Sequence, residues 1–187
     1  MPLSAPAVER EAIHTRHVVC RGYRRADGLW DIEGHLTDTK TYDFDSQYRG
    51  AVVAGTPVHQ MWIRLTLDDD LIIREVEAQT DDSPFPICGG ITGNFAKLKG
   101  LSIKPGFHAK VRELLGGTEG CTHLVEMLGP VATTAFQTIY PYRNRVQRQS
   151  GGDAPRSPRP RLIDTCHGWS SKGEVVKQIY PDRYTGP

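Results

Sequence analysis

Alternating apolar and polar positions predict two β-hairpins in the first half of the chain. Residues 17–23 and 29–36 have strand character and flank the turn sequence Ala-Asp-Gly. Within residues 61–67 the odd positions are Met, Ile, Leu and Leu, and the even positions are Trp, Arg and Thr, which is the period of a half-buried strand. Three aspartates then turn the chain, and residues 71–78 form the returning strand. His59 has the parity of the apolar positions, so we expect it on the buried face at the mouth of its strand.

The second half of the chain changes to the spacing of helices. Apolar residues predict helices within residues 91–98, 107–115 and 124–139. Pro130 either kinks the third helix or opens it. Strands that precede helices are typical of an α+β fold. We therefore expect an antiparallel sheet of N-terminal hairpins that is covered on one face by helices.

The start of the chain and one internal segment differ from this pattern. Residues 1–14 are predicted to be a flexible lead-in, and residues 15–187 a single domain of ordinary size. Residues 143–161 hold six Arg, one Asp and a Pro-rich stretch, a composition that cannot bury a core. We interpret this segment as an exposed Arg/Pro-rich loop, and favour a solvated linker over a contact for RNA or another anion.

Composition and charge exclude several classes of function. The formal net charge is +1, so no global field attracts nucleic acid or a membrane surface. No stretch approaches the roughly 20 apolar residues of a membrane span, and residues 1–14 lack the apolar run of a signal peptide. We therefore expect a cytoplasmic protein without nucleic-acid or membrane partners, in which the four cysteines are reduced.

Cysteine and histidine side chains at turns and element ends are the candidates for chemistry. Zn²⁺ prefers thiolate and imidazole ligands, usually four in a tetrahedron. One imidazole and three thiols would supply such a set, namely His59, Cys88, Cys121 and Cys166. Their spacing in the sequence is not that of a known zinc motif, and small buried cysteines are the alternative interpretation.

Cysteine–histidine catalysis is the competing interpretation of the same residues. Without a metal, His59 would act as the base, and Cys121 as the nucleophile or acid, because a helix N-terminus favours the thiolate. In the zinc-dependent alternative, His123 or Glu126 would carry protons.

Two tryptophans and several strand carboxylates are harder to assign. Trp30 and Trp62 would line a cleft for an aromatic substrate, with packing on the sheet as the alternative. Carboxylates on or near the strands, Asp38 among them, are interpreted as solvated surface groups.

Motifs along most of the chain resemble a family of uncharacterised bacterial proteins that is known only as a domain of unknown function. The segments that carry the resemblance are Gly28–Gly34, Pro57–His59, Gly120–Leu124, Ala132–Gln137 and Asp164–His167. The resemblance implies a cytoplasmic bacterial protein, and a setting in the breakdown of aromatic compounds or steroids.

Residues 57–135 are also similar in layout to iron–sulfur scaffold proteins of the IscU type. Both have two strands around a short acidic turn, then a cysteine at a helix start and another cysteine that opens the last helix. Cys88 and Cys121 match the cysteines of the scaffold, and His59 falls on its metal-site aspartate. Pro57 replaces a further cysteine and a glycine replaces a histidine, whereas a cluster needs about four ligands.

Three hypotheses for function follow. The favoured one is a small cytoplasmic enzyme of aromatic-compound or steroid catabolism, a lyase that cleaves a C–C bond in retro-aldol fashion at a Cys/His site, with or without Zn²⁺. The second is a metal or iron–sulfur scaffold or carrier protein without catalytic activity, and the third is a structural zinc domain. The partner of the enzyme would be a small aromatic or steroid-like molecule, and Trp169 is a candidate contact for a homodimer.

Overall fold

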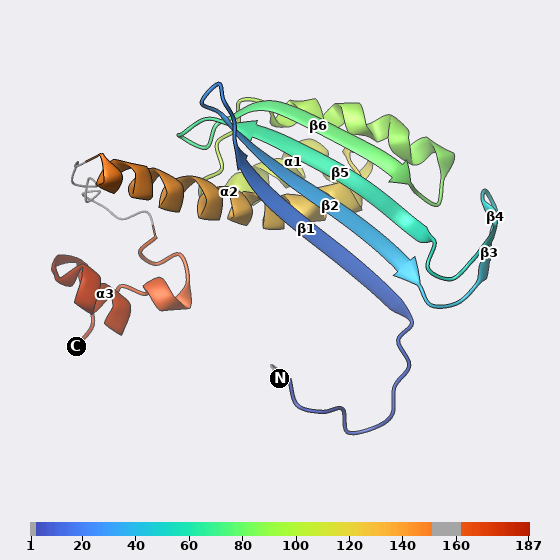
Figure 1. Cartoon of the computed structure of the whole chain (residues 1–187), viewed down its shortest axis with the longest axis horizontal. Coiled ribbons are helices and arrows are strands. Elements are labelled where there is room, and N and C mark those ends of the chain that lie inside the picture. The colour runs from blue at the N-terminus through green and yellow to red at the C-terminus, as the bar shows by residue number, and fades with distance from the viewer. Residues whose placement is uncertain (1–2, 151–161) are drawn as a thin grey trace. The chain divides into compact units, whose positions relative to one another are not determined.

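The chain divides into two compact units, Met1–Tyr140 and Pro141–Pro187. The computed structural model describes residues 3–150 and 162–187. The first unit holds the strands and most of the helices that Figure 1 shows. Residues 3–13 contain no helix or strand. The flexible lead-in over 1–14 and the single domain over 15–187 stay predictions.

A four-stranded antiparallel sheet forms the body of the first unit. Its strands, in spatial order, are β1 (His14–Arg24), β2 (Trp30–Lys40), β5 (Pro57–Leu67) and β6 (Ile73–Asp82). Both predicted hairpins are confirmed, because β1 pairs with β2 and β5 pairs with β6. A small separate hairpin, which the alternation does not indicate, consists of β3 (Phe44–Ser46) and β4 (Gly50–Val52).

Helices follow the strands and lie on one face of the sheet, so the predicted α+β class is confirmed (Figure 1). They are the 3-10 helix η1 (Pro86–Leu98), α1 (Phe107–Leu115), the 3-10 turn η2 (Gly117–Glu119) and α2 (Thr122–Gln149). The helix expected within 91–98 is therefore a longer 3-10 helix that starts at a proline. The similarity of this layout to IscU-type scaffolds stays a prediction.

The longest helix, α2, decides between the two alternatives for Pro130 and corrects one prediction. Pro130 lies inside this long helix rather than at its first position. Apolar residues on both sides of it, such as Leu128 and Val131, are buried, and this packing offsets the roughly 3 kcal/mol that an interior proline costs. Residues 143–149, expected to begin the exposed loop, are also helical, since Arg and Gln are good helix formers. The remainder of that loop, residues 151–161, lies outside the described residues.

The core of the first unit lies between the sheet and the helices. Along β2 every second residue from Trp30 to Asp38 is buried, as the alternation predicts. A Cβ atom at Gly34 would lie 2.7 Å from the Val131 side chain, so glycine at this position lets α2 pack closely on β2. The sheet thus has an inner face, which the helices cover, and an outer face, which carries none of the described helices of Met1–Tyr140 (Figure 1).

The second unit contains only short helical segments after the end of α2. They are the 3-10 turn η3 (His167–Trp169), α3 (Glu174–Ile179) and the 3-10 turn η4 (Pro181–Arg183). Val176 of α3 is buried. Across the described part of the chain, no helix combines the length and the apolar character that crossing a membrane requires.

Candidate active site

Asp38 is a buried carboxylate at the end of the inner face of the sheet. It continues the alternation of β2, in which the even-numbered residues face the core, and its side chain is 1 % exposed. The strand register places it beside Arg16 on β1 and His59 on β5. An unpaired, ionised carboxylate in such a position would strongly destabilise the folded protein, so the burial of Asp38 depends on these neighbours.

Four N–H groups surround the Asp38 carboxylate. Arg16 donates two hydrogen bonds of 2.8 Å, from Nε to Oδ1 and from Nη2 to Oδ2. His59 donates from Nδ1 to Oδ2 at 3.0 Å, and His14 donates from Nε2 to Oδ1 at 3.1 Å. A carboxylate offers about four lone-pair positions, so these four donors satisfy it fully.

These neighbours keep Asp38 ionised. Burial opposes the negative charge, but the hydrogen bonds and the charge of Arg16, with smaller contributions from His14 and His59, hold the pKa of Asp38 at about 2. The hydrogen bonds to Asp38 in turn raise the pKa of Arg16. Arg16 also donates from Nη1 to Glu126 Oε2 at 3.1 Å. The arginine therefore connects β1 and β2 to α2.

His59 is held in one tautomer by this carboxylate. Because an ionised carboxylate only accepts hydrogen bonds, Nδ1 of His59 carries the proton and Nε2 keeps its lone pair. The His59 side chain is 15 % exposed. Burial and the nearby His123 lower its pKa, and the attraction of Asp38 only partly opposes this change. A neutral imidazole with a free, oriented Nε2 has the form of a general base.

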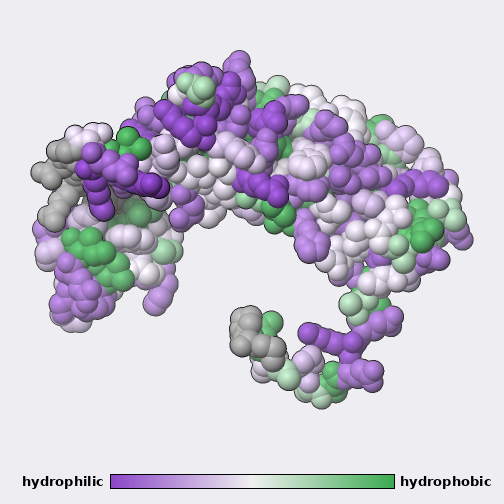
Figure 2. All heavy atoms as spheres, in the orientation of Figure 1, coloured by the Kyte–Doolittle hydropathy of each residue, from purple (hydrophilic) through white to green (hydrophobic). Residues whose placement is uncertain are grey.

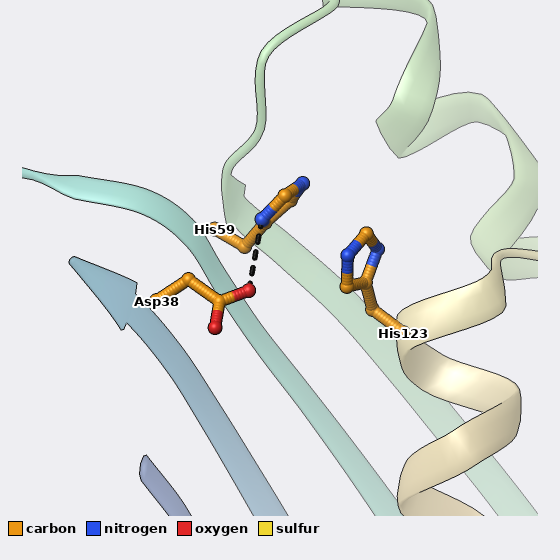
Figure 3. Close-up of side chains that lie close together, drawn as sticks. All are labelled: Asp38, His59 and His123. Carbon is orange, nitrogen blue, oxygen red and sulfur yellow. Dashed lines mark hydrogen bonds and ion pairs between the residues drawn. The ribbon is translucent and has the colours of Figure 1, made fainter. Parts of the chain in front are cut away.

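His123, in the first turn of α2, lies against His59. Figure 3 shows the two rings facing one another, and their centroids are 3.9 Å apart with planes tilted by 33°. Burial and the charge of Arg16 lower the pKa of His123 as well. The Cys121 sulfur lies 3.8 Å from His123 Nδ1 and 3.8 Å from the Met61 sulfur. One thiol therefore borders a pair of neutral imidazoles.

The same three side chains have the spacing of metal ligands. Asp38, His59 and His123 each offer an atom that lies within 4.8 Å of the others. Carboxylate and imidazole groups suit a divalent transition metal such as Zn²⁺. Because the Asp38 carboxylate is already fully hydrogen-bonded, the imidazoles would be the ligands, and Asp38 would orient His59 from behind.

The four ligands of the predicted zinc site are spread over both units of the chain. His59 belongs to the group of three, and Cys121 is adjacent to its His123. Cys88 is half-buried in η1, and Cys166 is exposed in Pro141–Pro187. Among the described residues of Met1–Tyr140, Cys88 belongs to no converging group of ligands. The zinc site itself stays a prediction.

Three of the predicted catalytic residues lie close together within Met1–Tyr140. His59, Cys121 and His123 gather at one end of the inner face, and the exposed Glu126 side chain reaches the same cluster through Arg16. The structure places the predicted proton carrier, Glu126, in an ion pair with this arginine rather than against either imidazole.

The two predicted substrate-lining tryptophans lie on opposite faces of the sheet. Trp30 is fully buried in the core and donates its indole N–H to Asp69 at 2.9 Å, so it is a packing residue rather than the wall of a cleft. Trp62 is on the outer face, where it stacks on His35 with ring centroids 3.6 Å apart. It lines a cavity of about 360 Å³ there, on the side of the sheet that faces away from Asp38.

Sequence reasoning missed the centre of this site. A signal for Asp38 exists, because it has the parity of Ile32 and Leu36 in a strand whose even positions are apolar. Arg16 and His14 carry no such signal. Their place beside Asp38 depends on the register of β1 against β2, which the sequence does not reveal.

Comparison with known proteins places the chain in a family whose description names no function. Residues 14–137, which hold the four-stranded sheet and every residue of the candidate site, match the family described as "Protein of unknown function (DUF2889)". Neither the curated proteins nor the solved structures that were searched gave a match. Because the matched region covers well over half of the chain, the protein belongs to this DUF2889 family.

Proposed function

We propose that the protein is an enzyme that uses His59 as a general base. The observation that carries the proposal is the hydrogen bond of 3.0 Å from His59 Nδ1 to the buried, ionised Asp38. This bond leaves the Nε2 lone pair available beside His123 and the Cys121 thiol. Titratable groups whose pKa values are shifted by burial and by specific partners are concentrated at functional sites, which supports an active site here.

The reaction proposed is that of a lyase, the retro-aldol cleavage of a C–C bond. His59 Nε2 would take the proton of a substrate hydroxyl group β to a carbonyl. The hydroxyl oxygen becomes a new carbonyl as the C–C bond breaks, and the bonding electrons pass to the other fragment as an enolate. A proton from the Cys121 thiol or from water then completes the second product. The proton held by His59 restores that donor, so no co-reactant is needed.

The substrate class proposed is a small aromatic or steroid-like β-hydroxy carbonyl compound. The resemblance to proteins from bacteria that degrade aromatic compounds or steroids motivates this choice. A cytoplasmic setting is proposed with it, and the four free cysteines are consistent with a reducing compartment.

The test of the reaction compares two histidine variants of the full-length protein on a panel of aryl β-hydroxy ketones, with the released aldehyde measured. We expect His59→Gln to lower the rate by about 10²- to 10⁴-fold, the usual contribution of a general base. The matched control is His108→Gln, which changes an exposed histidine of α1. Turnover that survives His59→Gln unchanged would exclude His59 as the base.

A second test needs no substrate. Nitrogen NMR of the imidazoles distinguishes the two neutral tautomers, and we expect His59 to be protonated at Nδ1 at pH 7. A proton on Nε2 would contradict the proposal, because the lone pair that acts as the base would then face Asp38.

A metal-binding protein is the second candidate function, and the convergence of Asp38, His59 and His123 favours it. A scaffold or carrier would hold a metal through the imidazoles without turnover. Elemental analysis of wild type and His123→Gln separates the two candidates. About one metal ion per chain that is lost in the variant, without turnover of any compound in the panel, would favour the carrier.

A further inference from the structure

The outer face of the sheet carries a row of four alternating charges. Arg21 on β1 pairs in register with Glu33 on β2, Glu33 with Arg64 on β5, and Arg64 with Glu77 on β6. Within one chain, Arg64 donates to Glu33 at 2.8 Å and to Glu77 at 2.7 Å. From β1 to β6, this charged row reads positive, negative, positive, negative. Such a row is complementary to its own reversed copy.

We propose that this outer face is the interface of a homodimer in which two sheets pack face to face. The two-fold axis would run parallel to the strands, over the junction between β2 and β5. This rotation lays β1 over the partner's β6, and β2 over the partner's β5. Each row of residues that are in register across the sheet then faces the same row of the second copy. Arg21 then faces the partner's Glu77, and Glu33 faces the partner's Arg64. A self-complementary patch of this kind is what an isologous interface requires.

The neighbouring row supplies aromatic contacts at the centre of the same face. It consists of Val19, His35, Trp62 and Gln79, again in register across the four strands. His35 and Trp62 lie on the two central strands and stack with planes only 8° apart. The proposed axis passes between them, so each stacked pair meets its own copy. Stacked aromatic residues near an interface centre are typical of the groups that contribute most to binding.

A cavity on this face is shaped and charged for a side chain of the partner. Its volume is about 360 Å³, and it is bordered by Glu33, Arg64, Glu77 and Asp81 as well as Trp62. Three carboxylates against one guanidinium leave a net negative lining. In the proposed packing, the exposed Arg21 of the second copy lies over this cavity. Figure 2 shows hydrophilic and near-neutral residues over the sheet, so charge complementarity would fix the register of the two copies.

The size of the face is sufficient for a dimer. Four strands at a spacing of about 4.8 Å, with about 3.3 Å per residue along an eleven-residue strand, give a face of roughly 700 Å². A standard protein interface buries about 800 Å² on each partner. The face lies on the opposite side of the sheet from Asp38, so the dimer does not depend on the proposed catalytic function.

Two charge reversals in the charged row test the dimer. Arg21→Glu would place a carboxylate opposite the partner's Glu77, and Glu77→Arg would place two guanidinium groups opposite each other. Each variant alone should raise the dimer dissociation constant by at least about tenfold, measured by sedimentation equilibrium at low salt. Mixing the two variants should form a heterodimer with affinity near that of wild type, because every pair across the interface is then attractive again.

This rescue cannot arise within one chain. Arg21 and Glu77 lie on the two edge strands, about 14 Å apart across three strand spacings. Lys110→Glu, a charge reversal on the exposed surface of α1, is the matched control and should leave the dissociation constant unchanged. Circular dichroism of each variant checks that it is folded. A wild-type protein that is monomeric at all concentrations would overturn the proposal, and so would a mixture of folded variants that fails to form heterodimers.

Discussion

The two faces of the sheet use the same chemical pair, an arginine with a carboxylate, under very different degrees of burial. On the inner face, Arg16 holds Asp38 with two hydrogen bonds, and the Asp38 side chain is 1 % exposed. On the outer face, Arg64 holds Glu33 and Glu77, whose side chains are 29 % and 66 % exposed. An exposed pair contributes at most about 1 kcal/mol to stability, whereas removal of one member of a buried pair costs about 3–5 kcal/mol. Burial, rather than the type of residue, therefore determines which face is sensitive to substitution.

The largest effect is expected for removal of the buried charge. Asp38→Asn should lower the free energy of unfolding by about 3–5 kcal/mol, because the negative charge that Arg16 and two histidines share is lost and an amide NH2 replaces one of its two acceptor oxygens. Urea denaturation measures the change. Glu33→Gln, the matched neutralisation in the same strand but on the outer face, should cost less than about 1 kcal/mol.

Equal losses of unfolding free energy in Asp38→Asn and Glu33→Gln would contradict the proposed difference between the two faces. A small loss in Asp38→Asn would mean that the four donors find water or other acceptors, so that the Asp38 carboxylate is not required for the fold. In that case the orientation of His59 would also lose its physical basis.

The sequence pattern predicts the frame of the molecule better than its site. The alternation in residues 61–67 is enough to predict β5. A similar alternation in β2 places Asp38 on the buried face. The site, by contrast, requires the register of three strands and the start of α2, which bring His14, Arg16 and His123 to Asp38 and His59. Contacts between residues that are far apart in the chain leave no local periodicity, so Asp38 is interpreted as a surface carboxylate until the strands are paired.

The positions of the cysteines predict the residues of the site less well than the alternation predicts the strands, for a related reason. A free thiol is also a small apolar residue that packs well, so its position at an element end does not distinguish a ligand from a core residue. Of the four thiols, only Cys121 has a described contact with a histidine of the site.

Acid should destabilise the inner face in two steps. The pKa values of His59 and His123 are lowered by burial, so below the ordinary pKa of 6.5 the unfolded chain binds protons more readily and stability starts to fall. The pKa of Asp38 is about 2 in the folded protein against an ordinary value of 3.8. Its contribution, about 2 kcal/mol, is therefore complete above pH 4 and is lost as the pH falls from 4 to 2.

Denaturation midpoints measured from pH 8 to pH 2 check both steps. Asp38→Asn should remove the lower step, and His59→Gln together with His123→Gln should remove most of the upper one. Wild-type and Asp38→Asn profiles that run parallel between pH 4 and pH 2 would show that the carboxylate titrates normally in the folded protein.

The smallest effect is expected for the outer-face arginine, measured in the monomer. At protein concentrations below the dimer dissociation constant, Arg64→Ala should lower the free energy of unfolding by less than about 1 kcal/mol, although it removes two ion pairs. Arg16→Ala should cost several times more, because it leaves Asp38 charged and buried with only histidine donors. A larger loss of unfolding free energy in Arg64→Ala that grows with protein concentration would instead arise from the dimer. In the dimer the same guanidinium faces the partner's Glu33. If the cost were large at every concentration, the outer-face pairs would be as important to the fold as the buried one, and burial would not explain the difference between the faces.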